Sequence, residues 1–389
     1  MKNKRLDFLS LKWSSYDKIA FSRDALSYSK NCILMFRDFD YFRLYHKPSH
    51  IKRSPHTIRL SPAIKTQFLK KLLEVLNIPL TQILLPIYLC ILYRPKVCVT
   101  DSPFIASIFG IAKKLDLCQQ TIYQAGDWFL VNARKEPMKY TATFFLFYYP
   151  DYLAVSLNDL VVDNSPKITE MRARHWKKDI VKCGIAPFPL PMQLNDKVND
   201  GHRSNICFLG QVRECKGLSI LLSILPTLNA KYGIKFKIFG PNNSKRDNFQ
   251  RNVREQGLKD LIEFHGWINM ETDHELIGDC FCGINLLESR ENNHSIFSTP
   301  GKLMHYMQNL IPPLITENSA LPLFIELLKK NSWGISTELN SEKIKSNIQH
   351  LFKNQQFFRE NLKQYAIDHP YISIHENLVM IKELQTNED

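Results

Sequence analysis

The second half of the chain alternates short apolar segments with helical patterns, and this alternation limits the possible folds more than any other feature. Five apolar segments predict buried strands, over 206–210, 236–240, 262–266, 283–287 and 313–316. Helical patterns separate them, over about 216–232, 245–256 and 273–277, from about 300, and over 321–330. Strands that alternate with helices indicate a parallel sheet covered on both faces. Such sheets bind ligands at the carboxyl ends of their strands, which is where Gly210, Gly240 and Gly266 lie in this pattern.

The first half shows the same alternation less regularly. Apolar segments predict strands over 6–11, 32–36, 97–100, 120–123 and 153–156, and helical patterns cover 21–28, 104–115 and 168–174. The 389 residues are enough for two domains. A proline-rich and then polar stretch, 187–202, suits a linker between them. We therefore expect an α/β fold of two Rossmann-like domains with parallel sheets facing a central cleft: residues 1–195, residues 203–370, and a C-terminal helix over 371–389 that packs back on the first domain.

Residues 78–93 form the longest apolar stretch of the chain, interrupted by Pro79, Gln82 and Pro86. A membrane-spanning helix needs about 20 apolar residues, so we expect a buried helix here. The preceding residues, 64–76, repeat apolar side chains at helical spacing with lysines among them. That pattern fits either a basic amphipathic helix on anionic headgroups or an ordinary surface helix. The start of the chain is basic but too short and too charged in its apolar part for a signal peptide.

The nine cysteines are scattered and show no C-x-x-C spacing. We therefore expect buried, reduced thiols in a cytosolic protein, and neither disulfides nor a zinc site.

Charge is distributed unevenly between the two halves. Lys and Arg number 51 against 38 Asp and Glu. Residues 1–195 contribute 29 − 15 = +14, and residues 196–389 contribute 22 − 23 = −1. A strongly basic half is expected to meet an acidic partner or surface. The chain has no zinc finger, helix-turn-helix pattern or aromatic-plus-basic RNA motif, which argues against a nucleic-acid partner.

Two loops carry the residue types that bind phosphate. In the loop 210–217, Gly210 lets a ligand approach the backbone, and Lys216 opens a helix whose free N–H groups suit a diphosphate. In the second, Ser298 or Thr299 is a candidate N-cap and a proline takes the first helical position. Lys302 in the first turn opposes the helix macrodipole, which is favourable only if an anion lies beside it. Solvated loops with incidental lysines remain the alternative for both.

The order of these elements resembles a known family. It includes Thr299-Pro300-x-Lys302-x3-Tyr306-Met307 and Pro312-Pro313-Leu314-Ile315, and it resembles the nucleotide-sugar-binding domain of GT-B glycosyltransferases. The resemblance is greatest to family 4 (group 1) and related bacterial polysaccharide-assembly transferases, and it covers about residues 204–340. It implies a nucleotide-diphosphate sugar as donor substrate and no separate cofactor.

The resemblance also assigns roles along this domain. Lys216 would bind the donor diphosphate, residues 298–302 would bind phosphate or ribose, and the loop at His265 and Gly266 would lie against the nucleobase. The donor-binding residues expected in this way are Gly210, Arg213, Lys216, Gly240, His265, Gly266, Glu288, Ser298, Thr299 and Lys302.

This sequence departs from the family pattern at several of these positions. Gln211 stands where many members have Arg, and Arg213 lies two residues further on. The pair of glutamates found in many retaining members is missing, because His305 and Phe297 occupy those places. Glu288 ends the fourth predicted strand and is kept as a ligand for a sugar or ribose hydroxyl. Without the glutamate pair, inversion is slightly favoured, and retention stays open.

Asp127 is the candidate catalytic base. It follows a predicted strand and Gly126, and the adjacent Trp128 and Phe129 could raise its pKa by desolvation and stack on a sugar. Its loop resembles the Tyr-x3-Asp loop of some inverting, membrane-associated GT-B enzymes, in which the aspartate is the base. A turn or helix-capping aspartate is the alternative.

No metal site is expected. Asp38-Phe39-Asp40 has the D-x-D spacing of metal-dependent transferases of another fold, but a solvated loop is favoured here. Cations and helix termini can instead stabilise the leaving diphosphate.

These observations together predict a cytoplasmic glycosyltransferase, peripheral to the inner leaflet of the plasma membrane, that extends a glycan or lipid-linked oligosaccharide in bacterial-type surface polysaccharide assembly. An anionic membrane surface is its expected partner, through Lys52, Arg53, Arg59, Lys65, Lys70 and Lys71. The alternatives are a sugar-nucleotide epimerase of the same fold, a catalytically silent scaffold subunit, and a basic nucleic-acid-binding protein.

Overall fold

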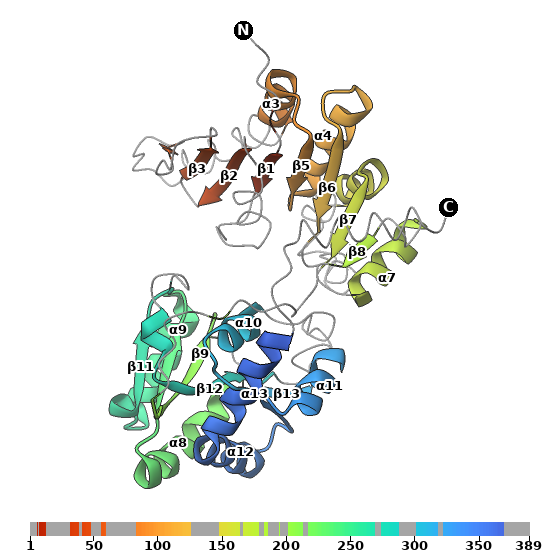
Figure 1. The fold of residues 1–389 in the computed structure, drawn as a ribbon. Helices are drawn as coiled ribbons and strands as arrows, with labels where there is room; N and C mark the ends of the chain where they lie inside the picture. Colours follow the sequence, from red (N-terminus) through yellow and green to blue (C-terminus); the bar gives the residue numbers. More distant parts are fainter. Residues whose placement is uncertain are drawn as a thin grey trace. The chain divides into compact units, whose positions relative to one another are not determined.

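The computed structural model describes residues 6, 8–12, 32–38, 41–47, 56–59, 83–125, 148–163, 166–178, 183–185, 194, 201–212, 217–268, 274–287, 301–317 and 322–368. The chain divides into two compact units, which are Met1–Pro187 with Ile372–Asp389, and Phe188–Tyr371 (Figure 1). The helix predicted over 371–389 lies outside the described residues, as do the helices predicted over 21–28 and 64–76. The domain boundaries stay a prediction.

The sheet of the N-terminal unit has the strand order β4-β3-β2-β1-β5-β6-β7-β8. Its strands are β1 (Phe8–Lys12), β2 (Cys32–Asp38), β3 (Tyr41–Lys47), β4 (His56–Arg59), β5 (Val97–Thr100), β6 (Gln120–Gln124), β7 (Leu160–Asp163) and β8 (Cys183–Ile185). The five neighbouring pairs β2–β1, β1–β5, β5–β6, β6–β7 and β7–β8 are parallel, as expected. The pairs β2–β3 and β3–β4 are antiparallel and form an edge that the sequence reading missed. Basic residues interrupt the apolar pattern of β3, so its strand signal is weak.

Helices α3 (Leu85–Tyr93), α4 (Pro103–Lys114) and α7 (Pro166–Trp176) and a further helix over 148–157 complete the described part of this unit. The strand predicted over 153–156 is wrong, because these residues lie within the helix 148–157. This helix packs closely on α4, since a Cβ atom on Gly110 would lie only 2.4 Å from Leu157 Cβ. A four-residue apolar segment is ambiguous between strand and buried helix, and the contact with α4 decides between them.

Helix α3 accounts for part of the apolar stretch 78–93. It buries Pro86, Leu89 and Cys90 against the core that Leu9, Cys98 and Phe109 form. The expectation of a buried helix holds for this face only, because Leu84, Tyr88 and Ile91 are more than half exposed. No helix in the described part of the chain is long and apolar enough to cross a bilayer.

The sheet of the C-terminal unit is entirely parallel, with the strand order β11-β10-β9-β12-β13-β14. The strands are β9 (Asn205–Leu209), β10 (Lys235–Phe239), β11 (Ile262–His265), β12 (Cys280–Asn285), β13 (Pro313–Thr316) and β14 (Ile335–Thr337). The five strands predicted from the sequence are present, and β12 begins three residues earlier than expected. Strand β14 was not predicted, because its three residues are too few for a periodic signal.

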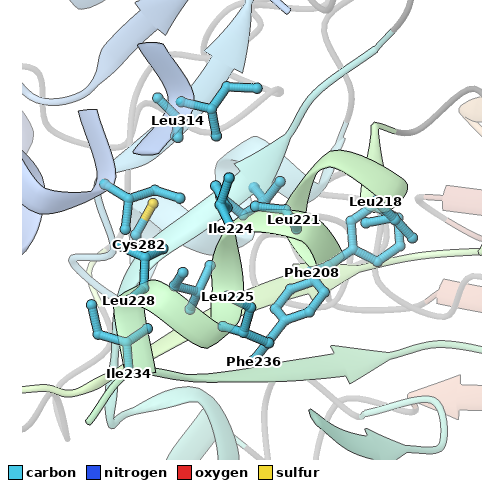
Figure 2. Close-up of a cluster of buried hydrophobic side chains, with 14 of the residues drawn as sticks. Phe208, Leu218, Leu221, Ile224, Leu225, Leu228, Ile234, Phe236, Cys282 and Leu314 are labelled. Carbon is cyan, nitrogen blue, oxygen red and sulfur yellow. The ribbon is translucent and has the colours of Figure 1, made fainter. Parts of the chain in front are cut away.

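Helices cover both faces of this sheet, as its apolar strands require. They are α8 (Leu218–Tyr232), α9 (Ser244–Glu255), α10 (Gly301–Gln308), α11 (Pro322–Asn331), α12 (Ser341–Lys353) and α13 (Gln355–Asp368), with short 3₁₀ turns at Lys259–Leu261 and His274–Ile277. Figure 2 shows the cluster on one face, where Leu221, Leu225 and Leu228 of α8 pack near Phe208 and Phe236 of the sheet. Six cysteines are buried, as expected, and carry free thiols in the structure: Cys90, Cys98, Cys118, Cys207, Cys280 and Cys282.

Candidate functional site

Three glycines follow directly after three neighbouring strands of the C-terminal sheet, and their backbones meet. The N–H of Gly210 donates to the carbonyl of Phe239 at 2.8 Å, and the N–H of Gly240 donates to the carbonyl of Gly266 at 3.2 Å. A Cβ atom on Gly240 would lie 2.1 Å from the Gly210 carbonyl oxygen, and Gly210 has φ +126°. Both positions therefore require glycine. The structure brings together the three glycines that the sequence singled out, at the carboxyl edge of the sheet.

Tyr306 fixes helix α10 above this edge. Its hydroxyl accepts a hydrogen bond from the N–H of Leu209 at 2.9 Å and donates one to the carbonyl of Ile284 at 3.1 Å. The ring lies against Gly283, where a Cβ atom would come within 2.4 Å of it. Burial raises the pKa of Tyr306 well above its ordinary value. The first turn of α10 is consequently held next to the ends of β9 and β12.

This position of α10 places Lys302 beside the first glycine turn. The Lys302 ammonium nitrogen lies 4.2 Å from the centroid of the Phe208 ring, a distance typical of a cation–π contact. It also lies 3.7 Å from the point that a Cβ atom on Gly210 would occupy. A positive charge thus stands at the carboxyl edge, next to a backbone that has no side chain in the way.

Arg246 supports this edge of the sheet, and the sequence analysis did not single it out. Its Nη1 donates to the carbonyl of Gly240 at 2.8 Å and to the carbonyl of His265 at 2.5 Å. The guanidinium therefore ties the ends of β10 and β11 together, and the side chain is buried. Asn243 caps the same helix by accepting from the N–H of Arg246 at 3.0 Å. The sequence signal that could have located this helix start is the N-cap residue Asn243, three residues after Gly240.

The predicted nucleobase loop begins with a stacked pair of rings. His265 stacks on Phe239 with ring centroids 4.6 Å apart and planes inclined by 15°. Its Nε2 lies 3.3 Å from Glu263 Oε2. Gly266 and Trp267 follow and are exposed. The loop thus presents an exposed aromatic ring, and its contact with a base stays a prediction.

The start of α8 and the end of β12 also lie close together. Gly217 has φ +63°, and a Cβ atom on it would come within 2.7 Å of the carbonyl oxygen of Leu286. The next residue, Leu287, both donates its N–H to Thr316 Oγ1 and accepts from it, each at 2.9 Å. In the sequence, Lys216 directly precedes Gly217 and Glu288 directly follows Leu287.

Six of the predicted site residues lie outside the described part of the chain: Asp127, Arg213, Lys216, Glu288, Ser298 and Thr299. The convergence of Lys216 with Lys302, and the role of Asp127 as a base, therefore stay predictions. Within the described ranges, no three His, Cys, Asp or Glu side chains are placed to hold a metal ion.

In the N-terminal unit, a buried polar network lies at the carboxyl ends of β6 and β7. The hydroxyl of Tyr123 donates to Asp151 Oδ1 at 2.8 Å, and Trp176 Nε1 donates to Asp151 Oδ2 at 2.8 Å. Arg172 forms an ion pair with Asp151, and its Nε donates to Asp163 Oδ1 at 3.0 Å. The network joins β6, β7, α7 and the helix 148–157 at this edge of the sheet.

Burial controls the charges of this network. Desolvation raises the pKa of Asp163 to about 6, although the nearby Arg172 opposes the shift. Burial also raises the pKa of Tyr123. Burial alone would lower the pKa of Arg172, but Asp151 and Asp163 raise it above its ordinary value. Sequence reasoning did not find this network, because its members lie on segments whose contacts only the fold establishes.

Comparison with known proteins identifies the C-terminal unit. Residues 193–369 match the family described as glycosyl transferases group 1. This part of the chain belongs to the group 1 glycosyl transferases. The family expected from the sequence is thereby confirmed. Among curated proteins, none matches the chain.

Solved structures extend the similarity to the whole fold. The chain is similar to HepE from Anabaena in complex with UDP and glucose, with 13% identity, a TM-score of 0.62, and coverage of 98% of this chain and 100% of that one. It is similar to sucrose-phosphate synthase from Thermosynechococcus elongatus, with 12% identity, a TM-score of 0.63, and coverage of 98% of each chain. It is also similar to WaaG, a glycosyltransferase involved in lipopolysaccharide biosynthesis, with 11% identity, a TM-score of 0.56, and coverage of 93% and 95%. The predicted GT-B fold is therefore confirmed.

Proposed function

We propose that this group 1 glycosyltransferase moves a sugar from a nucleotide-diphosphate sugar to a hydroxyl of a glycan or lipid-linked oligosaccharide, in the assembly of a bacterial-type surface polysaccharide. The observation that carries the proposal is the Lys302 ammonium beside the Gly210 turn, at the carboxyl edge of a group 1 domain. A diphosphate needs a cation and an uncovered backbone of this kind. UDP is the first nucleotide to test, because the similar HepE structures hold UDP and UDP-glucose.

The donor site that we propose is built from the ends of the C-terminal strands. Lys302, Lys216 and Arg213 bind the diphosphate together with the amino ends of α8 and α10, and they stabilise the charge that develops on the leaving group. Gly210 and Gly240 let the phosphates approach the backbone. Ser298, Thr299 and Glu288 bind phosphate or ribose and sugar hydroxyls, and the loop at His265 and Gly266 lies against the base.

In the proposed reaction, the bond between the sugar C1 and the diphosphate oxygen breaks, and the nucleoside diphosphate leaves with both electrons. The acceptor hydroxyl oxygen forms the new bond to C1, and its proton passes to the carboxylate of Asp127. A base on the acceptor side favours inversion at C1.

The proposed acceptor and cellular location rest on the net positive charge of the N-terminal half. Residues 1–195 carry 29 − 15 = +14 charges, and each cation near an anionic leaflet contributes about 1 kcal/mol to binding. We propose that the protein works at the cytoplasmic leaflet of the plasma membrane, where a lipid-linked acceptor would be held. The cations predicted for this contact are Lys52, Arg53, Arg59, Lys65, Lys70 and Lys71.

A thermal-shift screen against UDP-, GDP-, TDP-, ADP- and CMP-sugars tests the donor site. A ligand at 100 times its Kd stabilises the folded state by about 2.7 kcal/mol. We expect one nucleotide class to give such a shift, Lys302→Ala to lose most of it, and the matched control Lys363→Ala, an exposed lysine on α13, to retain it. If no nucleotide sugar shifts the melting temperature, or if Lys302→Ala binds as the wild type does, the donor site is wrong.

Two alternative functions, a sugar-nucleotide epimerase and a silent scaffold subunit, rest on His305, which stands where many family members carry a glutamate. A sugar-nucleotide epimerase of the same fold would convert or hydrolyse the donor without an acceptor. A silent scaffold subunit would bind the donor and turn nothing over. Chromatography of the products with and without acceptor separates both from a transferase.

A further inference from the structure

Large apolar side chains are exposed on one helical layer of the N-terminal unit. Of the fourteen exposed large hydrophobic residues among those described, four belong to the C-terminal unit. The other ten fall on α3 and the turn before it, on the end of α4, and on the helix 148–157. We call these ten residues the apolar layer: Ile83, Leu84, Tyr88, Ile91, Leu92, Ile111, Leu115, Tyr149, Tyr152 and Leu153.

The stripe on α3 is the centre of this layer. Leu84, Tyr88 and Ile91 are 56%, 58% and 57% exposed, and their spacing of four and three residues puts them on one face of the helix. The other face buries Leu89 and Cys90. Residues 83–93 contain no charged side chain. A helix that is apolar on all sides is normally covered on all sides, so α3 has the composition of a helix with a second partner.

The neighbouring helices continue the layer. Helix α3 lies beside α4 (Figure 1). On α4 and at its end, Ile111 and Leu115 are exposed one turn apart. Helix 148–157 also packs on α4, because Ser107 Oγ donates to the carbonyl of Pro150 at 2.8 Å. The three helices are thus connected through α4, and each exposes apolar side chains. Exposed apolar patches of this extent mark interaction surfaces.

Cations border the layer. Arg94 and Lys96 follow α3, Lys114 ends α4, and all three are exposed. The Lys178 ammonium lies 5.6 Å from the ring centroid of Tyr152. The border also contains acidic groups, namely the exposed Asp116 and the half-buried Asp159, which pairs with Lys113. The basic groups predominate, in agreement with the net charge of this half of the chain.

We propose that the apolar layer binds the surface of an anionic lipid bilayer. Tyrosines beside aliphatic side chains, with basic residues at the border, match a surface where headgroups meet acyl chains. The positive charge of this half is complementary to an anionic leaflet, and it disfavours a second copy of the chain, because like charges would be brought together. The proposal deepens the proposed function by naming the surface that holds the enzyme at its membrane, and binding to vesicles does not depend on sugar transfer.

Cosedimentation of the full chain with vesicles tests the proposal. The layer variant carries Leu84→Gln, Tyr88→Ser and Ile91→Gln. The matched control carries Leu276→Gln, Phe357→Ser and Ile367→Gln, three exposed apolar residues of the C-terminal unit. With vesicles of 70% phosphatidylcholine and 30% phosphatidylglycerol, we expect the control to bind as the wild type does and the layer variant to bind about 100-fold more weakly, since each side chain removed from the lipid costs several-fold in partition. In 0.5 M salt the wild type should still bind more strongly than the layer variant, because apolar contacts are not screened.

The opposite results are equally specific. Equal binding of the layer variant and the wild type, or an equal loss in both variants, would overturn the proposal. The proposal would also fail if the wild type did not bind the vesicles but formed dimers that the layer variant does not form. The apolar layer would then contact a second copy of the chain. Donor-induced thermal shifts are measured on the same proteins: loss of donor binding with intact vesicle binding would count against the proposed function alone. If the layer variant has a lowered melting temperature, Tyr88→Ser alone replaces it. This single variant is expected to bind the vesicles about fivefold more weakly than the wild type.

Discussion

Replacing Asp163 by asparagine tests how burial controls the charge of the network in the N-terminal unit. Asp163 is fully buried at the end of β7, and burial raises its pKa from the ordinary 3.8 to about 6. Between these two values, the folded protein holds a proton that the unfolded chain has lost. Because the folded state binds more protons there, the free energy of unfolding falls as the pH rises from about 4 to about 6, and the loss is complete above that window.

The size of the effect follows from the shift. A pKa raised from 3.8 to about 6 corresponds to about 3 kcal/mol, since one pKa unit is about 1.4 kcal/mol. At pH 5 most of the folded Asp163 is still protonated, so about 1 kcal/mol of that loss falls between pH 5 and pH 8. Asparagine keeps an oxygen that can accept from Arg172 but cannot ionise. Between pH 5 and pH 8, the free energy of unfolding of Asp163→Asn should therefore rise by about 1 kcal/mol relative to that of the wild type, whatever the difference at pH 5.

Urea unfolding at pH 5, 6, 7 and 8, followed by tryptophan fluorescence, measures this difference. Trp176 reports directly, because its Nε1 donates to Asp151 in the same network. Asp116→Asn, which removes an exposed carboxylate, is the control and should change the free energy of unfolding by less than about 0.5 kcal/mol. Parallel pH profiles for Asp163→Asn and the wild type, or a difference of opposite sign, would refute the assignment of burial as the dominant cause.

Three further predictions concern the proposed transferase. Asp127→Asn should lower transfer at least about 100-fold and leave the donor-induced thermal shift intact; near-normal turnover in a radiolabel assay would remove Asp127 from the mechanism. Tyr306→Phe leaves the buried N–H of Leu209 and the carbonyl of Ile284 without the hydroxyl, which should cost about 1–3 kcal/mol in calorimetry and weaken donor binding; unchanged stability and affinity would contradict the role given to Tyr306. Transfer should persist in excess EDTA, because cations and helix termini stabilise the diphosphate, and strict dependence on an added metal would speak against this chemistry.

The group 1 domain could be predicted well from the sequence, because its signals are local. The run that became β9 is apolar after Asn205 and is buried throughout, as a strand covered on both faces must be. The runs that became β10 and β11 keep apolar residues but also carry lysines, a glutamate and a histidine. A glycine follows each one, and glycines at successive strand ends indicate a ligand-binding edge. The motif around Lys302 and Tyr306 indicated the family. The structure explains the spacing of the motif, because the Tyr306 ring packs directly on Gly283.

The errors arose where local patterns were ambiguous or weak. Residues 153–156 look like a short strand but form part of the helix 148–157, which packs on α4 through Pro150 and Leu157. A four-residue apolar run does not distinguish the two structures. Strand β3 was missed because its basic residues break the apolar pattern. The role of Arg246 depends on two carbonyl groups that come together only when β10 and β11 pair.

The sequence by itself determined the alternation of strands and helices, the carboxyl edge with its glycines, and the basic character of the first half, because each of these depends on residue type and short spacing. Only the tertiary structure decided which face of α3 stays exposed and which buried charges meet. Asp151 and Arg172 stand 21 residues apart, and their pairing depends on how the helices pack on the sheet. Periodicity shows that a side chain is apolar or charged, but packing between distant segments decides what it touches.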